Sequence, residues 1–329
     1  GGSGTNITID NVEVDGTHDN FGDYEGGHCM YISQQNSTNY IVQNSHVHDC
    51  GGIGITANNG ATTLNQGLII RNNKVHNVGR SVSATKSGIA VSSRQQNGLI
   101  YNNLVYDNPG AGITVYGIST ENIGVYNNSV YNNGNPGIGI GTFNAGLNIK
   151  VKNNIVYNNN AGINIYQWAN GTILDDNLVY NHTTPVINNG VNSTLGTVIT
   201  SNPLFVNAAA GDFHLQTGSP AINVGTDLSA TFTVDYAGTT RDTGVNTWEL
   251  GAYTVATTIS PLHLAFGSPP VNAFVNAILP NITVRLLDAA NTLQDIDTGD
   301  VTLAKVSGPG VIGGTLVATP VDGIATFTG

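Results

Sequence analysis

The chain has 329 residues and a formal net charge of −11, with 9% charged residues and 42 glycines. Globular domains usually carry about a quarter charged residues, so this composition favours a fold built from many turns held by neutral hydrogen bonds. No run of about 18 apolar residues occurs, so membrane insertion is not expected. No nucleic-acid partner is predicted.

One pattern returns along the first half of the sequence. Each copy has an asparagine or aspartate, a valine three residues later, a turn, and then an apolar-x-apolar pair. The copies begin at Asn11, Asn44, Asn72, Asn102, Asn127, Asn153 and Asp176, and their valines are Val14, Val47, Val75, Val105, Val130, Val156 and Val179. The pairs are Met30/Ile32, Ile53/Ile55, Ile89/Val91, Ile113/Val115, Ile138/Ile140 and Ile163/Ile165. Intervals of 25, 26 and 23 residues separate the last four copies, and such a period indicates a solenoid.

The local period identifies the kind of solenoid. Apolar residues alternate at every second position, which predicts short strands rather than helices. Three short strands per coil, stacked at ~4.8 Å, give a parallel β-helix. The six asparagines that open the copies are then predicted to form a ladder of side-chain amides at a turn.

Two loops are longer than the others. From the valine to the next apolar pair there are 16 residues in the first coil, 6 in the second and 14 in the third. Both long loops leave the same corner ~10 Å apart, which predicts a saddle wide enough for a sugar chain. The first loop is acidic, whereas five of the ten Lys and Arg residues lie in or beside the third coil: Arg71, Lys74, Arg80, Lys86 and Arg94. Charged loops can also be plain solvated surface, and this alternative stays open.

A column of rings follows the valines. It consists of His48, His76, Tyr106, Tyr131, Tyr157 and Tyr180. Strand alternation points these rings outward, where they would stack along the axis and either hold sugar rings or stabilise the exterior. Cys29 and Cys50 fall in adjacent coils and could pair or simply pack.

The repeat fades after Tyr180. The run "NPLFVN…GDFHL…GSPAINVG…ELGAY" resembles the C-terminal closing segment of bacterial secreted right-handed parallel β-helix proteins. That group contains polysaccharide lyases, epimerases and hydrolases. The resemblance covers about residues 1–253, with a closing segment at about 200–253. It implies right-handed winding, export to the medium or the bacterial cell surface, and structural roles for Asp212, Asp235, Arg241, Asp242 and Glu249.

Residues 254–260 are expected to be a linker. Residues 261–329 alternate apolar and polar positions between turns and resemble the immunoglobulin-like modules of bacterial surface proteins. At 69 residues this partial β-sandwich falls short of the ~100 of a full module, so the native protein is expected to be a longer, monomeric, multidomain chain. Asp295, Asp297 and Asp300 suggest Ca²⁺ only weakly, and no metal site or cofactor is predicted.

The predicted function is an extracellular carbohydrate-active protein that binds an acidic polysaccharide and cleaves it by β-elimination or epimerises it. Such chemistry needs a cation beside the substrate carboxylate and an acid or base near the reacting carbon. The candidate catalytic residues are Asp23, Tyr24, Glu25, His28, Arg80 and Lys86, and the candidate substrate-binding residues are His48, His76, Arg94, Tyr106 and Tyr131. Two alternatives remain, a glycoside hydrolase using Asp23 and Glu25 and a non-catalytic adhesion or stalk module.

Overall fold

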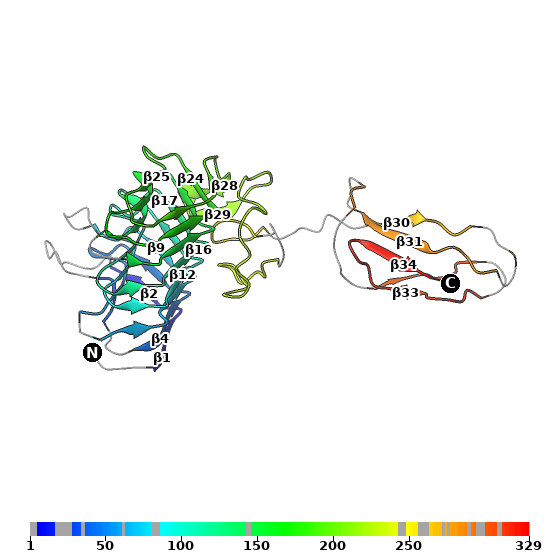
Figure 1. Cartoon of the computed structure of the whole chain (residues 1–329), viewed down its shortest axis with the longest axis horizontal. Coiled ribbons are helices and arrows are strands. Elements are labelled where there is room, and N and C mark those ends of the chain that lie inside the picture. Colours follow the sequence, from blue (N-terminus) through cyan, green and yellow to red (C-terminus); the bar gives the residue numbers. More distant parts are fainter. Residues whose placement is uncertain are drawn as a thin grey trace. The chain divides into compact units, whose positions relative to one another are not determined.

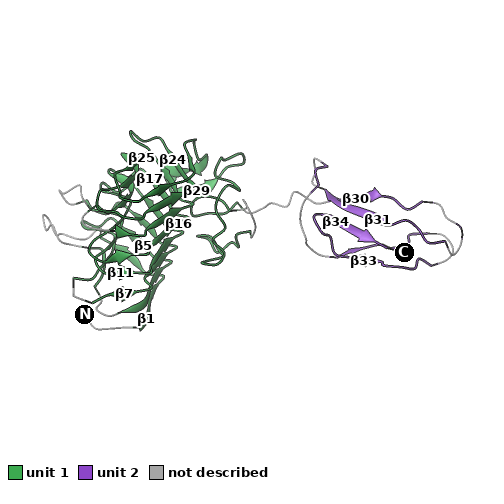
Figure 2. Cartoon of the chain, in the orientation of Figure 1, with its two compact units in different colours: residues 1–255 green, residues 256–329 purple. Residues whose placement is uncertain are grey.

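A computed structural model describes residues 5–16, 28–33, 37–60, 63–80, 86–142, 146–242, 248–255, 263–271, 274, 277–287, 291–293, 300–307 and 311–328. Contacts divide the chain into two compact units, Gly1–Val255 and Ala256–Gly329, coloured separately in Figure 2.

The first unit is a parallel β-helix whose coils each contribute to three parallel sheets, stacked as a column of strands (Figure 1). Sheet I contains β1 (Thr5–Asp10), β4 (Thr38–Gln43), β7 (Asn65–Gln66), β8 (Ile69–Arg71), β11 (Gln95–Gln96), β12 (Leu99–Tyr101), β15 (Thr120–Glu121), β16 (Gly124–Tyr126), β19 (Gly146–Leu147), β20 (Lys150–Lys152), β23 (Ile173–Asp175) and β26 (Thr194–Leu195). Sheet II contains β2 (Glu13–Asp15), β5 (His46–His48), β9 (Lys74–His76), β13 (Leu104–Tyr106), β17 (Ser129–Tyr131), β21 (Ile155–Tyr157), β24 (Asn177–Tyr180) and β27 (Val198–Ile199). Sheet III contains β3 (Met30–Ile32), β6 (Ile55–Asn58), β10 (Ile89–Ser92), β14 (Ile113–Tyr116), β18 (Pro136–Ile140), β22 (Ala161–Ile165) and β25 (Val186–Asn188).

The valine column predicted from the repeat lies at the centre of sheet II. Val14 pairs with Val47, Val47 with Val75, and the register continues without a shift through Val179. From Val47 onward these valines are completely buried. One predicted pair is wrong, because Ile55 and Ala57, rather than Ile53 and Ile55, align with the inward residues of β3 and β10.

The main asparagine ladder lies one position later than predicted. It consists of Asn73, Asn103, Asn128, Asn154 and Asn177, all completely buried. Each of the first four donates its side-chain amide to the next at 2.9 or 3.0 Å. The predicted residues adopt positive φ of 48 to 57°, a turn conformation that asparagine tolerates. A single bond of 3.2 Å joins Asn153 to Asn127 in the predicted column, because the next residue along the chain is the one that points inward.

The closing segment packs on the flank of the β-helix. It contains β28 (Phe205–Asn207), the 3₁₀ turn η1 (Ala208–Ala210) and β29 (Asp212–Leu215). Phe205 and Phe213 form a buried cluster with Leu104 and Tyr106 of sheet II. This segment therefore covers the outer face of sheet II in the middle and later coils and leaves the first coils uncovered by that cluster.

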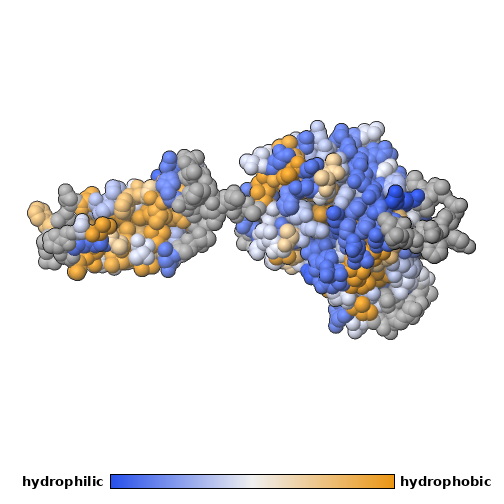
Figure 3. All heavy atoms as spheres, turned by 180° about the vertical axis from the view of Figure 1, so that it is seen from behind, coloured by the Kyte–Doolittle hydropathy of each residue, from blue (hydrophilic) through white to orange (hydrophobic). Residues whose placement is uncertain are grey.

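The second unit is antiparallel. Its strands are β30 (His263–Ser268), β31 (Ile282–Leu287), β32 (Val301–Thr302), β33 (Val317–Ala318) and β34 (Ile324–Phe327), arranged as β30–β31–β34 and β32–β33. A small core surrounds Val284 and Phe327, whereas Phe274 and Val306 are 94% and 98% exposed. Apolar residues are correspondingly prominent on the face of this unit shown in Figure 3. Over the described parts of both units, no helix is long and apolar enough to cross a membrane.

Candidate functional site

A cleft of about 520 Å³ crosses the outer face of sheet III. Its residues come from strands and turns between β6 and β25, which span ~24 Å along the axis. Three aromatic side chains line it, Tyr116 at the end of β14 and Tyr166 and Trp168 just after β22. Trp168 is 46% exposed, which is unusual for so large an apolar side chain and leaves one of its faces available to a ligand.

Polar groups complete the cleft. Thr114, Thr142 and Asn135 belong to its lining. Within the described residues, neither Thr142 Oγ1 nor Oδ1 of the neighbouring Asn164 has a hydrogen-bond partner, although both atoms are shielded from solvent. Buried oxygens without hydrogen-bond partners are uncommon in proteins.

Gly139 keeps the middle of the cleft open. It lies between Thr114 of β14 and Asn164 of β22 in the sheet register. A Cβ atom at this position would lie 3.1 Å from Thr142 Cγ2 and 3.7 Å from Tyr166 Cε2. A larger side chain would therefore enter the space between the polar and aromatic walls.

His28 and Lys86 flank the end of the cleft nearest the first coils. Ser87, the neighbour of Lys86, lines the cleft and contacts Thr114 Oγ1 through its hydroxyl at 3.0 Å. His28 Nδ1 lies 2.9 Å from Thr56 Oγ1, and its ring stacks on Tyr31. Burial, followed by the positive charge of Lys86, lowers the pKa of His28 below its ordinary value. The imidazole is thus neutral at pH 7 and able to accept a proton.

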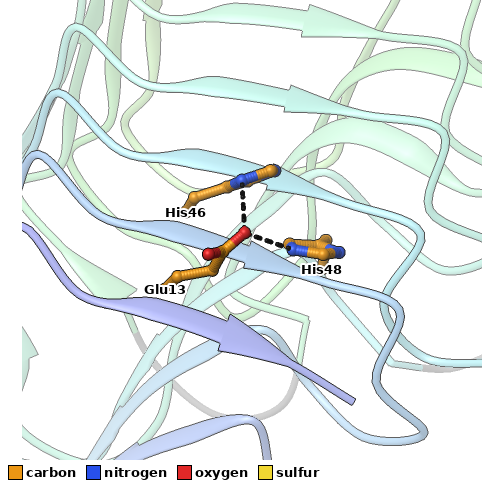
Figure 4. Close-up of side chains that lie close together, drawn as sticks. All are labelled: Glu13, His46 and His48. Carbon is orange, nitrogen blue, oxygen red and sulfur yellow. Dashed lines mark hydrogen bonds and ion pairs between the residues drawn. The ribbon is translucent and has the colours of Figure 1, made fainter. Parts of the chain in front are cut away.

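A second cluster lies on the outer face of sheet II in its first coils (Figure 4). Glu13 of β2 is the register partner of His46, and His48 lies two residues further along β5. Glu13 Oε1 is 3.6 Å from His46 Nδ1 and 3.3 Å from His48 Nε2. The Nε2 atoms of His46 and His76 lie 2.8 Å apart, so one of these two rings donates a proton to the other.

Asp49 and Arg80 extend this cluster toward the corner between sheets II and III. Asp49 Oδ2 is 2.8 Å from His48 Nδ1, and its other oxygen accepts a bond of 2.8 Å from Arg80. Burial opposes protonation of His48, but the hydrogen bonds to Asp49 and Glu13 raise its pKa above the ordinary value. Burial and the neighbouring cations instead lower the pKa of His76 to about 4.

The structure separates the predicted site residues into two groups. Lys86 lies near His28 beside the sheet III cleft, whereas the guanidinium of Arg80 points to Asp49 on the sheet II side. The five cationic side chains in or beside the third coil do not form one patch, because a single coil of the β-helix contributes strands to all three sheets. Arg71 contacts Gln43 and Tyr101 on sheet I, and Arg94 lies in the turn between β10 and β11.

The predicted ring column does stack, since the rings of His48, His76 and Tyr106 follow one another at centroid separations of 5.4 and 4.8 Å. The closing segment packs on the later part of the column. The closing segment reduces the exposure of Tyr106 to 6%, and Phe213 contacts both Tyr106 and Tyr131. Asp23, Tyr24 and Glu25 lie outside the described residues.

Sequence reasoning missed Glu13, His46 and the aromatic cleft residues. The signal for the cluster was present in "Glu13-Val14-Asp15" and "His46-Val47-His48", where polar residues flank two equivalent valines. The residues immediately before and after an inward-pointing valine both point to the outer face of the sheet. Residues at equivalent positions of adjacent coils are neighbours on that face. Cys29 and Cys50 are not joined by a disulfide, and the contact with Cys50 together with burial raises the pKa of Cys29.

These features define a right-handed parallel β-helix with an open cleft and a separate histidine–carboxylate cluster. The family model for the right handed beta helix region matches residues 31–204, more than half of the chain, so the protein belongs to this family.

Solved structures of similar fold include a glycoside hydrolase, with a TM-score of 0.51 and 12% identity over 66% of this chain and 40% of that protein. A periplasmic alginate epimerase matches with a TM-score of 0.46 and 17% identity over 61% and 46% of the two chains. A pectate lyase matches with a TM-score of 0.41 and 14% identity over 69% and 67%. This chain spans less than half of the first two proteins. No curated protein sequence matches it.

Proposed function

We propose that this protein binds a polysaccharide in the cleft on sheet III. The observation that carries the proposal is the combination of three aromatic side chains, among them the exposed Trp168, with threonine and asparagine side chains along one elongated cleft. Aromatic faces pack against the apolar faces of sugar rings, and polar oxygens fix their hydroxyl groups. The resemblance of residues 1–253 to secreted β-helix proteins points to the same ligand class.

Filling the cleft should abolish this binding. Gly139→Leu places a side chain between Thr142 and Tyr166 and is expected to weaken polysaccharide binding at least about tenfold, which corresponds to about 1.4 kcal/mol. Trp168→Ala removes an aromatic face and should have a similar effect. Calorimetric titration with plant and algal polysaccharides measures both.

Lys150→Leu adds the same side chain on sheet I and serves as the control, because Lys150 is exposed and lies outside the cleft. Ligand binding should also change the fluorescence of Trp168, whereas the protein's other tryptophan, Trp248, is completely buried. Wild-type affinity in both cleft variants would contradict the proposal.

A second candidate function is a uronate lyase or epimerase. It is favoured by the placement of a neutral imidazole, His28, and a cation, Lys86, at one end of the cleft. Lys86 would neutralise the substrate carboxylate, while His28 would accept the proton from the adjacent carbon. The predicted partners Tyr24, Asp23 and Glu25 belong to the loop that precedes His28, and they remain candidates for the acid or for hydrolytic chemistry.

His28→Ala and Lys86→Ala are each expected to reduce the rate on a uronate polymer at least about tenfold, within the range that acid–base groups contribute. Arg80→Ala should cost less, because Asp49 already holds its guanidinium. Ultraviolet-absorbing unsaturated ends report elimination, and proton exchange at the sugar carbon reports epimerisation. Because the pKa of His28 is lowered, the rate should begin to drop on the acid side at a lower pH than it would with an ordinary histidine. Unchanged rates in both variants would leave binding as the function.

We further propose a location outside the cell or on its surface, with the second unit acting as an immunoglobulin-like module in a monomeric chain. The antiparallel pairing of β30, β31 and β34 and the composition of residues 261–329 support this assignment.

A further inference from the structure

The cluster on sheet II brings three possible metal ligands close together. Zinc bound at 2.0–2.2 Å to nitrogen and oxygen in a tetrahedron holds its ligand atoms about 3.4 Å apart. Glu13 Oε1 lies 3.6 Å from His46 Nδ1 and 3.3 Å from His48 Nε2. One ligand atom from each of these three residues lies within 4.8 Å of the other two. Figure 4 shows one carboxylate oxygen of Glu13 joined to a nitrogen of each of the two imidazoles.

The ring nitrogens of His46 and His48 that do not face Glu13 already have polar partners. Histidines that bind metals usually donate their second N–H to a carboxylate or another acceptor. His48 has Asp49 Oδ2 at 2.8 Å from its Nδ1, and Arg80 fixes the other oxygen of that carboxylate. His46 has the Nε2 atom of His76 at 2.8 Å from its own Nε2. Nδ1 of His46 and Nε2 of His48 thus both remain to face Glu13.

We propose that Glu13, His46 and His48 bind one divalent transition-metal ion, with zinc as the expected ion. Two imidazoles and one carboxylate leave a fourth position for water or a ligand group, as in open zinc sites. The side chain of Glu13 is 68% exposed, so the carboxylate side of the cluster contacts solvent.

The surrounding charges are mixed. The carboxylates of Asp15 and Asp49 face His48, with Asp15 Oδ1 at 3.9 Å and Asp49 Oδ2 at 2.8 Å from its Nδ1. Lys74 lies opposite His46 on the adjacent strand β9, and its positive charge disfavours a bound cation at this position. Imidazole and carboxylate ligands together favour Zn²⁺, Co²⁺ or Ni²⁺ over Ca²⁺, which prefers an all-oxygen shell.

The test uses the whole chain, freed of metal with a chelator and titrated with Zn²⁺ by calorimetry. The expected result is saturable binding of one ion per chain. Co²⁺ should give the intense visible bands of a four-coordinate site, and X-ray absorption should show a nitrogen and oxygen shell. His46→Ala, His48→Ala and Glu13→Gln should each weaken binding at least about 100-fold, and Asp49→Asn, which keeps all three ligands, about 10- to 100-fold.

His214→Ala is the matched control. His214 also pairs with a carboxylate, Asp212 at 2.7 Å, but belongs to the closing segment and to no cluster of three ligands among the described residues. Circular dichroism confirms that each variant keeps its strands. Absence of saturable binding, wild-type affinity in both His46→Ala and His48→Ala, or an equal loss in His214→Ala would overturn the proposal. Gly139→Leu should leave metal binding unchanged. A failure of the metal proposal can therefore be distinguished from a failure of the polysaccharide proposal.

Discussion

Asn133→Ala is expected to lower the free energy of unfolding of the β-helix by about 4 kcal/mol, because Asn133 is the middle member of a second buried asparagine ladder, Asn108–Asn133–Asn159, whose hydrogen bonds alanine cannot replace. Asn133 is 2% exposed, and its amide donates to Asn159 Oδ1 at 2.7 Å and to the carbonyl of Val105 at 3.2 Å. Its side-chain oxygen accepts from both the backbone and the side chain of Asn108. Alanine would remove the acceptor for two buried donors, each costing about 1–3 kcal/mol.

The neighbouring Asn132 provides the comparison. It is exposed, adopts φ of 51°, and its amide donates to Asp107 at 2.6 Å on the outside of the same turn. Asn132→Gly keeps the left-handed conformation available and should change stability by less than about 1 kcal/mol. Urea unfolding followed by circular dichroism measures both variants. Similar midpoints for Asn133→Ala and Asn132→Gly would mean that the ladder of Asn108, Asn133 and Asn159 does not contribute to the stability of the coils.

Arg241→Met is expected to release the closing segment from the flank of the β-helix and to cost about 3–5 kcal/mol. Arg241 is 1% exposed, and its guanidinium donates to the carbonyls of Gly251 and Ala252 at 3.0 and 3.2 Å and to Asn102 Oδ1 at 3.2 Å. Burial lowers its pKa to about 10, still well above neutrality, so it is charged at pH 7.

The variant would leave two buried carboxylates without their cation. Asp235 and Glu249 are 1% and 4% exposed, and both stabilise the charge of Arg241. Uncompensated buried charge is among the most destabilising changes a protein can undergo. Limited proteolysis should then cut within residues 201–255, and a dye that binds apolar surface should report the uncovered Tyr106 and Phe213. Asp242→Asn, at an exposed neighbouring position, should behave like the wild type. Retained protease resistance in Arg241→Met would contradict the anchoring role.

The sequence alone determined the β-helix and the inward valines. Both follow from the repeat, because a period of about 25 residues with alternating apolar positions admits few other packings. The stacking of His48, His76 and Tyr106 followed from the same alternation. The sequence also located the two long loops, although residues 17–27 and 81–85 lie outside the described parts.

The tertiary structure decided which neighbours meet. A shift of one residue turns a side chain from the core to the surface, so the sequence placed the ladder on Asn102 whereas Asn103 points inward. Arg71, Arg80 and Arg94 are close in sequence, but one coil carries them to different faces. Glu13 and His46 lie 33 positions apart, yet adjacent coils bring them together. Contacts between coils depend on register and on how the closing segment folds back, and neither is encoded within a single repeat.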